Sequence, residues 1–326
     1  MGLLIDGQWH DKWYDTSKSG GRFVRSEATF RGQISDEGDH PPAPGRYHLY
    51  VAWACPWAHR SLLYRHLKGL SGLISVSVVH PHMLGEGWVF GDQHPDHLFG
   101  ATHLHKVYTR AQADFTGRVT VPVLWDKQAD TIVNNESAEI IRIFDTAFAD
   151  LADPDAPLAD YPLCPPDLID AIDAVNDDVY NNINNGVYKS GFATTQDAYD
   201  EACTALFEAM DRMEARLSSQ PWLLGDRLTE ADLRLFPTLL RFDPVYHVHF
   251  KCSRKRLIDY PHLYDHTRAI FQIPGVPSTL NLDETRAHYF YSHDTLNPHR
   301  IVAQAPVTLD LHAPAQRTRA LPKGCR

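Results

Sequence analysis

The sequence has few cysteines, and none of them lies in a Cys-x-x-Cys pair. Their number is odd, and they stand far apart, at positions 55, 164, 203, 252 and 325. A disulfide framework usually has an even number of cysteines, and a zinc cage usually has Cys-x-x-Cys pairs. The scarcity therefore argues against both and favours a reducing compartment, which we expect to be the cytoplasm.

Long apolar runs and an excess of positive charge are also missing. No apolar segment approaches the roughly 20 residues that span a membrane. The net charge of −10 argues against partners such as nucleic acid or an anionic membrane surface. The first residues, Met1 to Asp6, lack the basic region and the long apolar core of a secretory signal. These absences predict a protein that binds neither nucleic acid nor membranes. The 326 residues suffice for two domains, so we expect a two-domain protein.

Nineteen histidines raise the question of a metal site. Three pairs are spaced by two residues, which on a strand puts both rings on one face: His80/His82, His103/His105 and His247/His249. No carboxylate or cysteine completes any of these pairs locally. Surface or capping histidines are the ordinary interpretation, and we expect no metal.

The most informative segment is Cys55-Pro56-Trp57-Ala58-His59-Arg60. It follows a strand pattern at 45–54 and opens a helical pattern over 56–69 that stops at a glycine. Proline suits the first helical position, which puts Cys55 at or near the N-cap, facing free N–H groups and the positive end of the helix dipole. Because this position stabilises the nucleophilic thiolate, the segment predicts sulfur chemistry. The alternative for Cys55 is a buried, inert cysteine. Arg60 is either a surface charge or a residue that supports the local electrostatic field.

The first half of the chain has an α/β order with a mixed sheet. Residues 1–40 are polar and predict an extended arm with little regular structure, which Phe23 and Phe30 could pin to the body. The domain proper is expected over 41–150. Its further elements are a second strand at 74–79, a weakly periodic insert at 81–117, a strand at 121–126, a hairpin partner at 131–133 and a helix starting at 134. Pro122 is either a cis proline or a trans proline on an edge strand.

The second half is helical. Residues 150–166 are rich in Asp, Ala and Pro and predict a linker at 151–166, and helical periodicity extends from 167 to about 285. Thr229 and Asp232 are spaced as a capping box before an apolar helix. The tail, 286–326, lacks periodicity and is expected to be irregular.

The order of these parts resembles the glutathione transferase fold, with a thioredoxin-like N-terminal domain and an all-α C-terminal domain. Short motifs resemble those of the Xi class, the glutathionyl-hydroquinone reductases. The motifs are Gly45 to Val51, Cys55 to Arg60, Gly87 to Phe90, Arg118 to Asp126, Asn134 to Ser137, Asn185 to Phe192, Arg241 to Asp243, His249 to Cys252 and His288 to His293. Each motif alone is weak, but the ordered set is strong. Phe290 departs from the family, which usually has a second tyrosine there, so Tyr289 and Tyr291 both stay open as the tail residue at the site.

The resemblance implies a reaction. Cys55 would attack the glutathione sulfur of a glutathionyl-quinol and form a mixed disulfide, which a second glutathione would resolve to oxidised glutathione. Tyr188 and Tyr289 would protonate the ring and hydrogen-bond its oxygens, with the tail reaching the active site. The alternative for each tyrosine is an amphipathic core residue.

The resemblance also implies a binding site for glutathione, a co-substrate, and a homodimer. The residues concerned are Trp88, Arg118, Val121, Pro122, Glu136 and Ser137. Val121 would pair with the peptide backbone, Ser137 with a carboxylate and Glu136 with the α-amine, while Arg118 would hold the glycyl carboxylate and Trp88 would close over the ligand. Without the resemblance, these residues would be helix caps, a surface arginine and a packed aromatic.

Two rival functions share much of this pattern. An omega-like thiol transferase or dehydroascorbate reductase would use the same cysteine, but it leaves the insert with Trp88 and the tail with Tyr289 unexplained. A non-catalytic binding module with the same fold would commonly lose the nucleophile, which this chain retains.

Overall fold

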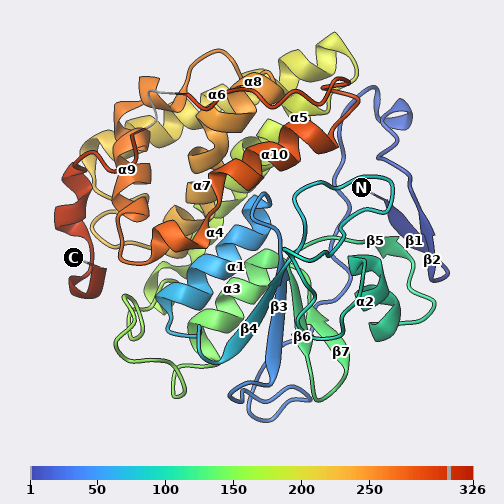
Figure 1. Cartoon of the computed structure of the whole chain (residues 1–326). Coiled ribbons are helices and arrows are strands. Elements are labelled where there is room, and N and C mark those ends of the chain that lie inside the picture. Colours follow the sequence, from blue (N-terminus) through green and yellow to red (C-terminus); the bar gives the residue numbers. More distant parts are fainter. Residues whose placement is uncertain (1, 307–309, 326) are drawn as a thin grey trace. The chain divides into compact units, whose positions relative to one another are not determined.

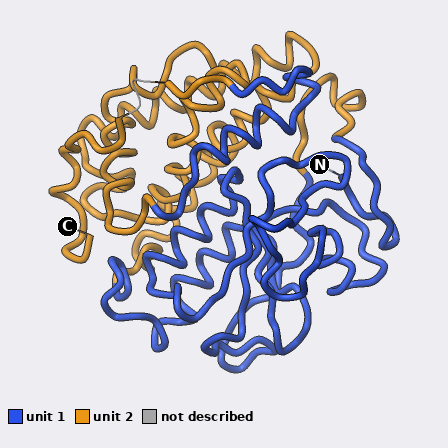
Figure 2. The backbone as a smooth tube through the Cα atoms, in the orientation of Figure 1, with its two compact units in different colours: residues 1–13, 26–160, 278–302 blue, residues 14–25, 161–277, 303–326 orange. Residues whose placement is uncertain are grey.

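The computed structural model describes residues 2–306 and 310–325, and the chain divides into two compact units. Unit 1 comprises the residues up to 13 together with 26–160 and 278–302, and unit 2 comprises 14–25, 161–277 and the residues from 303 on (Figure 2). The change at 160–161 lies inside the expected linker. Met1 of the predicted arm and residues 307–309 and 326 of the predicted tail lie outside the described residues.

Unit 1 is built on a four-stranded sheet with the strand order β4-β3-β6-β7. The pair β3–β4 is parallel and the other two pairs are antiparallel. Two helices, α1 and α3, lie side by side in front of this sheet (Figure 1). The elements are β3 (Tyr47–Val51), α1 (Pro56–Leu67), β4 (Ile74–Val78), β6 (Val123–Asp126), β7 (Thr131–Asn134) and α3 (Ser137–Thr146).

This order confirms the predicted strand–helix–strand unit and hairpin. A parallel pair such as β3–β4 needs a crossover, and α1 supplies it. All five residues of β3 are buried, as expected for a central strand. The helix α1 stops before Gly69, whose φ of +73° is the left-handed conformation that glycine adopts without strain.

The arm has little regular structure, as predicted, but two segments of unit 1 contain elements that were not predicted. The predicted arm contains a hairpin, β1 (Leu3–Ile5) and β2 (Gln8–His10), and β1 also pairs with β5 (Gly117–Arg118). Its turn is Asp6-Gly7, both with positive φ, which is a common two-residue hairpin signal. The insert contains the helix α2 (Leu104–Ala111), whose N-cap, His103, makes no side-chain capping bond. The helix is amphipathic, with Leu104, Val107 and Tyr108 on its buried face, but it is short and its start has no side-chain cap to mark it.

The tail also contains a helix, α10 (Leu282–Ser292), where an irregular segment was expected from 286. Asn281 accepts the N–H of Glu284 at 3.1 Å and donates to its carboxylate at 2.9 Å, so the start of this helix has an ordinary cap. Thr285 donates to the carbonyl of Trp53 at 3.1 Å. The helix is thereby anchored two residues before Cys55, within unit 1.

Unit 2 is helical, as predicted. Its helices are α4 (Ile169–Asp178), α5 (Gly186–Gly191), α6 (Gln196–Ser219), α7 (Glu230–Arg241), α8 (His247–His249) and α9 (Pro261–Phe271), with π-helical segments at Val179–Asn184 and Phe242–Tyr246. Short 3-10 turns of the chain lie at Ser17–Ser19, Pro166–Leu168, Leu257–Asp259, Val276–Thr279, Gln316–Ala320 and Lys323–Cys325. Among the described residues, no helix is long and apolar enough to cross a membrane.

The start of α7 confirms the predicted capping box. The carboxylate of Asp232 accepts the N–H of Thr229 at 2.9 Å and its hydroxyl at 3.0 Å. The same carboxylate accepts the N–H of Leu223 at 2.9 Å and lies 3.0 Å from Nε2 of His266. Thr229, Asp232 and His266 are fully buried, so this cap belongs to the core of unit 2.

Candidate active site

Cys55 is the N-cap of α1, as predicted. Its backbone is extended, and its Sγ accepts the N–H of Ala58 at 3.4 Å. The Sγ atom also lies 3.5 Å from the carbonyl oxygen of Val121. The residue is half-buried, so the thiol is neither sealed in the core nor fully solvated. The free N–H groups of the helix favour the thiolate at this position.

The other cysteines have different surroundings. Cys203, Cys252 and Cys325 are buried, and Cys164 is half-buried. Burial raises the pKa of Cys325 to about 12 and raises the pKa of Cys252 well above its ordinary value. Buried thiols of this kind stay protonated near neutrality and are poor nucleophiles. Among the five cysteines, Cys55 alone caps a helix N-terminus with its sulfur.

The peptide bond between Val121 and Pro122 is cis, which settles the alternatives for that proline. The segment before it is held from the side by Tyr108, whose hydroxyl donates to the carbonyl of Thr120 at 2.9 Å. The side chain of Asn135 donates to the same hydroxyl at 3.1 Å. This buried chain of hydrogen bonds joins the Val121 segment to the start of α3, and no sequence motif had singled out Tyr108.

The start of α3 supports the simple capping interpretation of Glu136. Its Oε1 accepts the N–H of Ala138 at 3.0 Å, and its own N–H donates to Asn134 at 2.7 Å. Ser137 is 2 % exposed, and its hydroxyl lies 3.4 Å from the same Oε1. The helix therefore presents a carboxylate and a hydroxyl side by side at its N-terminus.

Arg60 is a residue that sequence reasoning left undecided. It is 2 % exposed, so the surface-charge interpretation was wrong. Its guanidinium lies over the ring of Trp57 at 4.6 Å and donates from Nη1 to the hydroxyl of Ser137 at 3.4 Å. A buried cation from α1 thus meets the positive end of α3, an arrangement that favours an anionic ligand.

Trp88 lies in the insert and is almost fully buried. Its indole stacks on the ring of His288 from α10, with ring centroids 4.8 Å apart and planes 18° apart. The indole Nε1 has no hydrogen-bond partner within the described part of the chain. A buried donor in this state is ready to meet an acceptor from a ligand or from water.

The two tail tyrosines point to different surroundings. Tyr289 is 2 % exposed and contacts the rings of His288 and His293, at centroid distances of 5.3 and 5.6 Å. Tyr291 is half-buried and stacks on His82 at 3.8 Å. Because His288 is also the partner of Trp88, the geometry favours Tyr289 over Tyr291 as the tail residue at the site.

Tyr188 is the one predicted site residue that belongs to unit 2. It lies on α5 among aromatic rings, with Phe250 at a centroid distance of 5.4 Å and Phe23 at 6.5 Å. The guanidinium of Arg25 lies 4.8 Å from its ring centroid. These surroundings match an amphipathic core tyrosine, so its catalytic role stays a prediction.

Arg118 lies on β5, and its guanidinium donates to the backbone carbonyl of Lys12. The side chain therefore holds the N-terminal hairpin region in this structure.

Phe30 also pins the segment after the hairpin, stacking on Phe115 at a centroid distance of 5.4 Å. The pinning predicted for Phe30 is confirmed, while the role of Arg118 in glutathione binding stays a prediction.

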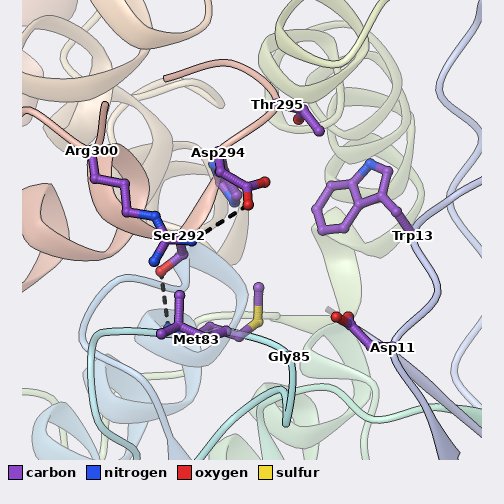
Figure 3. A pocket seen from close by; sticks show the side chains of 10 residues that line it. Asp11, Trp13, Met83, Gly85, Ser292, Asp294, Thr295 and Arg300 are labelled. Carbon is purple, nitrogen blue, oxygen red and sulfur yellow. Dashed lines mark hydrogen bonds and ion pairs between the residues drawn. The ribbon is translucent and has the colours of Figure 1, made fainter. Parts of the chain in front are cut away.

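A cavity of about 230 Å³ opens in unit 1 beside the end of α10. Figure 3 shows Trp13 and Asp11 on one side of it and Arg300 on the other. No residue predicted to bind glutathione or to act in catalysis lines this cavity. Its lining residue His293 contacts both Trp13 and Tyr289, so the cavity adjoins the tail tyrosine.

Comparison with known families assigns both halves of the chain. The family model described as Glutathione S-transferase, N-terminal domain matches residues 54–147, and the one described as Glutathione S-transferase, C-terminal domain matches 196–269. The crystal structure of the glutathione-S-transferase Xi from Phanerochaete chrysosporium superposes with a TM-score of 0.85 at 50% identity, covering 88% of this chain and 98% of that one. The chain belongs to the Xi class of glutathione transferases. The predicted fold class, a thioredoxin-like N-terminal domain and an all-α C-terminal domain, is confirmed.

Two curated relatives of this Xi-class transferase have the same descriptive name. Glutathionyl-hydroquinone reductase YqjG of Escherichia coli (strain K12) is 51% identical over 94% of this chain and 95% of its own length. Glutathionyl-hydroquinone reductase PcpF of Sphingobium chlorophenolicum is 52% identical over 94% and 96%. The glutathione-bound structure of YqjG superposes on the transferase with a TM-score of 0.87 at 46% identity, covering 97% of this chain and 99% of that one.

Proposed function

We propose that this Xi-class transferase is a glutathione-dependent reductase that cleaves glutathionyl-hydroquinones to hydroquinones. The observation that carries the proposal is the half-buried Sγ of Cys55 at the N-terminus of α1, 3.5 Å from the Val121 carbonyl. A transferase that only activates glutathione can use a serine or tyrosine, whereas a reductase needs a sulfur that forms and releases a disulfide. The names of the two curated relatives support the same activity.

The reaction balances in two steps. The Cys55 thiolate attacks the glutathionyl sulfur, and an S–S bond forms as the bond between that sulfur and the ring carbon breaks. The ring departs with the electron pair and takes a proton, which gives the hydroquinone. A second glutathione thiolate then attacks the mixed disulfide, which releases oxidised glutathione and regenerates the Cys55 thiolate.

The polar groups of unit 1 support a proposed site for glutathione. The γ-glutamyl carboxylate would meet the Ser137 hydroxyl, the N–H groups that open α3 and the buried charge of Arg60. Glu136 would hold the α-amine, and the backbone of Val121 would pair with the peptide in strand fashion. These assignments use groups that already lie at one end of α1 and α3.

The other end of glutathione would be held by the insert and by β5. The indole N–H of Trp88 would donate to a glutathione carbonyl, which would satisfy a buried donor that lacks a partner among the described residues. Arg118 would pair with the glycyl carboxylate in exchange for the carbonyl of Lys12. We further propose that the enzyme is cytoplasmic and works as a homodimer. Sedimentation analysis would test whether it is a dimer.

The substrate class is tested by comparing two substrates under the same conditions with glutathione. We expect kcat/KM for a glutathionyl-hydroquinone to exceed that for dehydroascorbate by at least about 100-fold, a difference of about 3 kcal/mol in transition-state binding. The reverse order would favour an omega-like thiol transferase. Absence of turnover, together with absence of a glutathione adduct on Cys55 after incubation with oxidised glutathione, would favour a non-catalytic module.

The roles of the two tyrosines are tested by phenylalanine variants. Tyr289→Phe and Tyr188→Phe should each slow turnover of the glutathionyl-hydroquinone by about 100-fold or more, because a proton donor is lost. Reduction of a simple glutathione mixed disulfide, which needs no ring protonation, should stay unchanged. Tyr291→Phe serves as the control on α10, and equal losses on both substrates would exclude a ring-specific role.

A further inference from the structure

A second cluster of polar side chains lies in unit 1, outside the proposed glutathione site. The carboxylate of Glu86 approaches two histidines at the start of α2, with Oε2 3.9 Å from Nε2 of His103 and 3.6 Å from Nε2 of His105. One potential ligand atom from each of the three residues lies within 4.8 Å of the other two. Glu86 is seventeen positions away from the nearer histidine, so local spacing could not reveal this group.

His105 is fixed in place before any ligand arrives. Its ring stacks on Trp9 at a centroid distance of 4.8 Å with planes 17° apart, and the residue is only 5 % exposed. Its Nε2 has no hydrogen-bond partner among the described residues, and this is the atom that faces Glu86. A buried ring nitrogen without a partner is the kind of group that a ligand or an ion satisfies.

The loop that carries Glu86 is held against the same tryptophan. The indole of Trp9 donates to the carbonyl of Gly85 at 2.9 Å. Gly87 has a φ of +70°, and a Cβ at that position would lie 2.6 Å from the Trp9 ring. Only glycine therefore fits the turn, and Trp9 orders the loop and His105 together.

His103 is oriented by a second contact. Its Nδ1 lies 2.7 Å from the hydroxyl of Thr102, which leaves Nε2 toward Glu86. Metal-binding histidines commonly use the second ring nitrogen in this way to fix their orientation. The Glu86 side chain is 62% exposed, so its carboxylate can move the roughly 0.3 to 0.6 Å that separate its distances of 3.6 and 3.9 Å from the roughly 3.3 Å between ligands of a tetrahedral ion. The three ligand atoms lie within 4.8 Å of one another, so the half-buried ring of His103 would also turn toward His105 when all three bind one ion.

We propose that Glu86, His103 and His105 bind one divalent transition-metal ion, with Zn²⁺ as the principal candidate. Two imidazoles and one carboxylate suit such an ion and do not suit Ca²⁺ or Mg²⁺, which prefer oxygen ligands. Three protein ligands leave a coordination position for water. This site is independent of the proposed reductase activity, and it revises the expectation that the histidine pairs bind no metal.

Metal binding would act on a segment next to the glutathione site. The carbonyl of Trp88 accepts the N–H of Leu104 at 2.9 Å, and Val89 forms a β-bridge with His103. An ion held between Glu86 and the two histidines would fasten the turn before Trp88 to the first residues of α2. We therefore expect the ion to stabilise this part of unit 1.

Calorimetric titration with zinc chloride tests the proposal. The Cys55→Ser protein, free of glutathione, is the background, because the half-buried thiol of Cys55 could also bind zinc. We expect one Zn²⁺ per chain. Glu86→Gln and His103→Ala should each weaken zinc binding by at least about tenfold, because even the loss of a group that only supports a metal ligand costs about that much affinity. His247→Ala is the matched control, since it alters a pair of the same spacing in unit 2 and should leave binding unchanged.

Fluorescence gives a second measurement that locates the ion. Because Trp9 stacks on His105, binding of the open-shell ion Co²⁺ should quench part of the tryptophan emission, and Trp9→Phe should remove that part. Circular dichroism would establish that the variants are folded. Absence of stoichiometric Zn²⁺ binding, or binding that Glu86→Gln and His103→Ala leave unaltered, would overturn the proposal.

Discussion

The helices α1 and α7 begin in different ways. The cap of α7 is a closed network in which the buried Asp232 accepts bonds of 2.9 to 3.0 Å from Thr229 and Leu223 and contacts His266 at 3.0 Å. The cap of α1 is a half-buried thiol whose sulfur accepts the N–H of Ala58 at 3.4 Å and lies 3.5 Å from the carbonyl oxygen of Val121. A cap that stabilises the fold uses its bonding capacity within the core, whereas a cap that reacts keeps its atom accessible and weakly held. The two sites should therefore respond oppositely to mutation.

The largest effect on activity is expected for Cys55→Ser. Reduction of glutathionyl-hydroquinone should fall by at least about 1,000-fold, because a serine oxygen cannot form and release a disulfide. The free energy of unfolding should change by less than about 0.5 kcal/mol, since serine is itself a good N-cap. Steady-state kinetics and urea unfolding measure the two quantities. Activity within about tenfold of the parent enzyme would contradict the mixed-disulfide route.

The opposite response is expected for Asp232→Ala at the start of α7. Loss of the carboxylate leaves several buried donors without a partner and should cost about 3 kcal/mol of unfolding free energy. Below the unfolding transition, kcat/KM per folded molecule should stay the same. Asp167→Ala is the control, because that carboxylate is exposed and solvent screens its ion pair with Arg227, so this variant should change the free energy of unfolding very little. Equal destabilisation by both variants would show that the buried network contributes no more to the free energy of unfolding than an exposed ion pair.

A buried ion pair at the end of β6, between Asp126 and Arg46, predicts how the stability of unit 1 depends on pH. Burial raises the pKa of Asp126, but hydrogen bonds from Arg46 and His40 and from two backbone N–H groups outweigh it and bring the pKa to about 2. The unfolded value is about 3.9, so the carboxylate contributes about 2 to 3 kcal/mol at neutral pH, and this is lost as the pH falls from about 5 through 2. Urea unfolding across this range measures the change.

Asp126→Asn isolates that contribution. The variant should be less stable than the parent at pH 7, and the difference between the two should shrink as the pH falls through the lower part of the range. Its glutathione kinetics at neutral pH should match those of the parent, because the pair lies outside the proposed site. A constant difference in stability at every pH would contradict the assigned pKa.

The smallest effect is expected for Ser137→Ala at the start of α3. This helix start combines a capping carboxylate, as in α7, with a proposed ligand contact, as in α1. Loss of one hydrogen bond to the glutathione carboxylate should raise KM for glutathione by about tenfold, or about 1.4 kcal/mol, while kcat stays within about twofold. Ser218→Ala, an exposed serine of α6, is the control. A loss in kcat with an unchanged KM would assign Ser137 to the chemistry instead of to binding.

Much of unit 1 was predictable because its signals are local. Alternating β-branched residues mark β4, and a proline after Cys55 fixes both the start of α1 and the position of the thiol. The same kind of local signal was available for two elements that were missed: Asp6-Gly7 for the hairpin, and Asn281 with Glu284 for α10. A turn dipeptide and a capping residue indicate such elements even where apolar periodicity is weak.

The remaining features could not be predicted locally, because each depends on a contact between distant segments. Arg60 is buried only because α3 begins beside it, and its bond to Ser137 spans 77 positions. Glu86 meets His103 only because the chain folds back through the bridge at Val89. Local patterns predict elements and the residues at their ends, while the set of groups that gather around them depends on tertiary packing.

The discontinuous composition of unit 1 has a consequence for how the protein is made. The ribosome releases Cys55 early, yet α10 and the rest of segment 278–302 belong to the same compact unit. At roughly 5 to 20 residues per second, about 10 to 50 seconds pass between synthesis of the cysteine and synthesis of residue 302. During that interval the segment before Cys55 lacks the hydrogen bond from Thr285 to the carbonyl of Trp53, so unit 1 can be completed only late in synthesis.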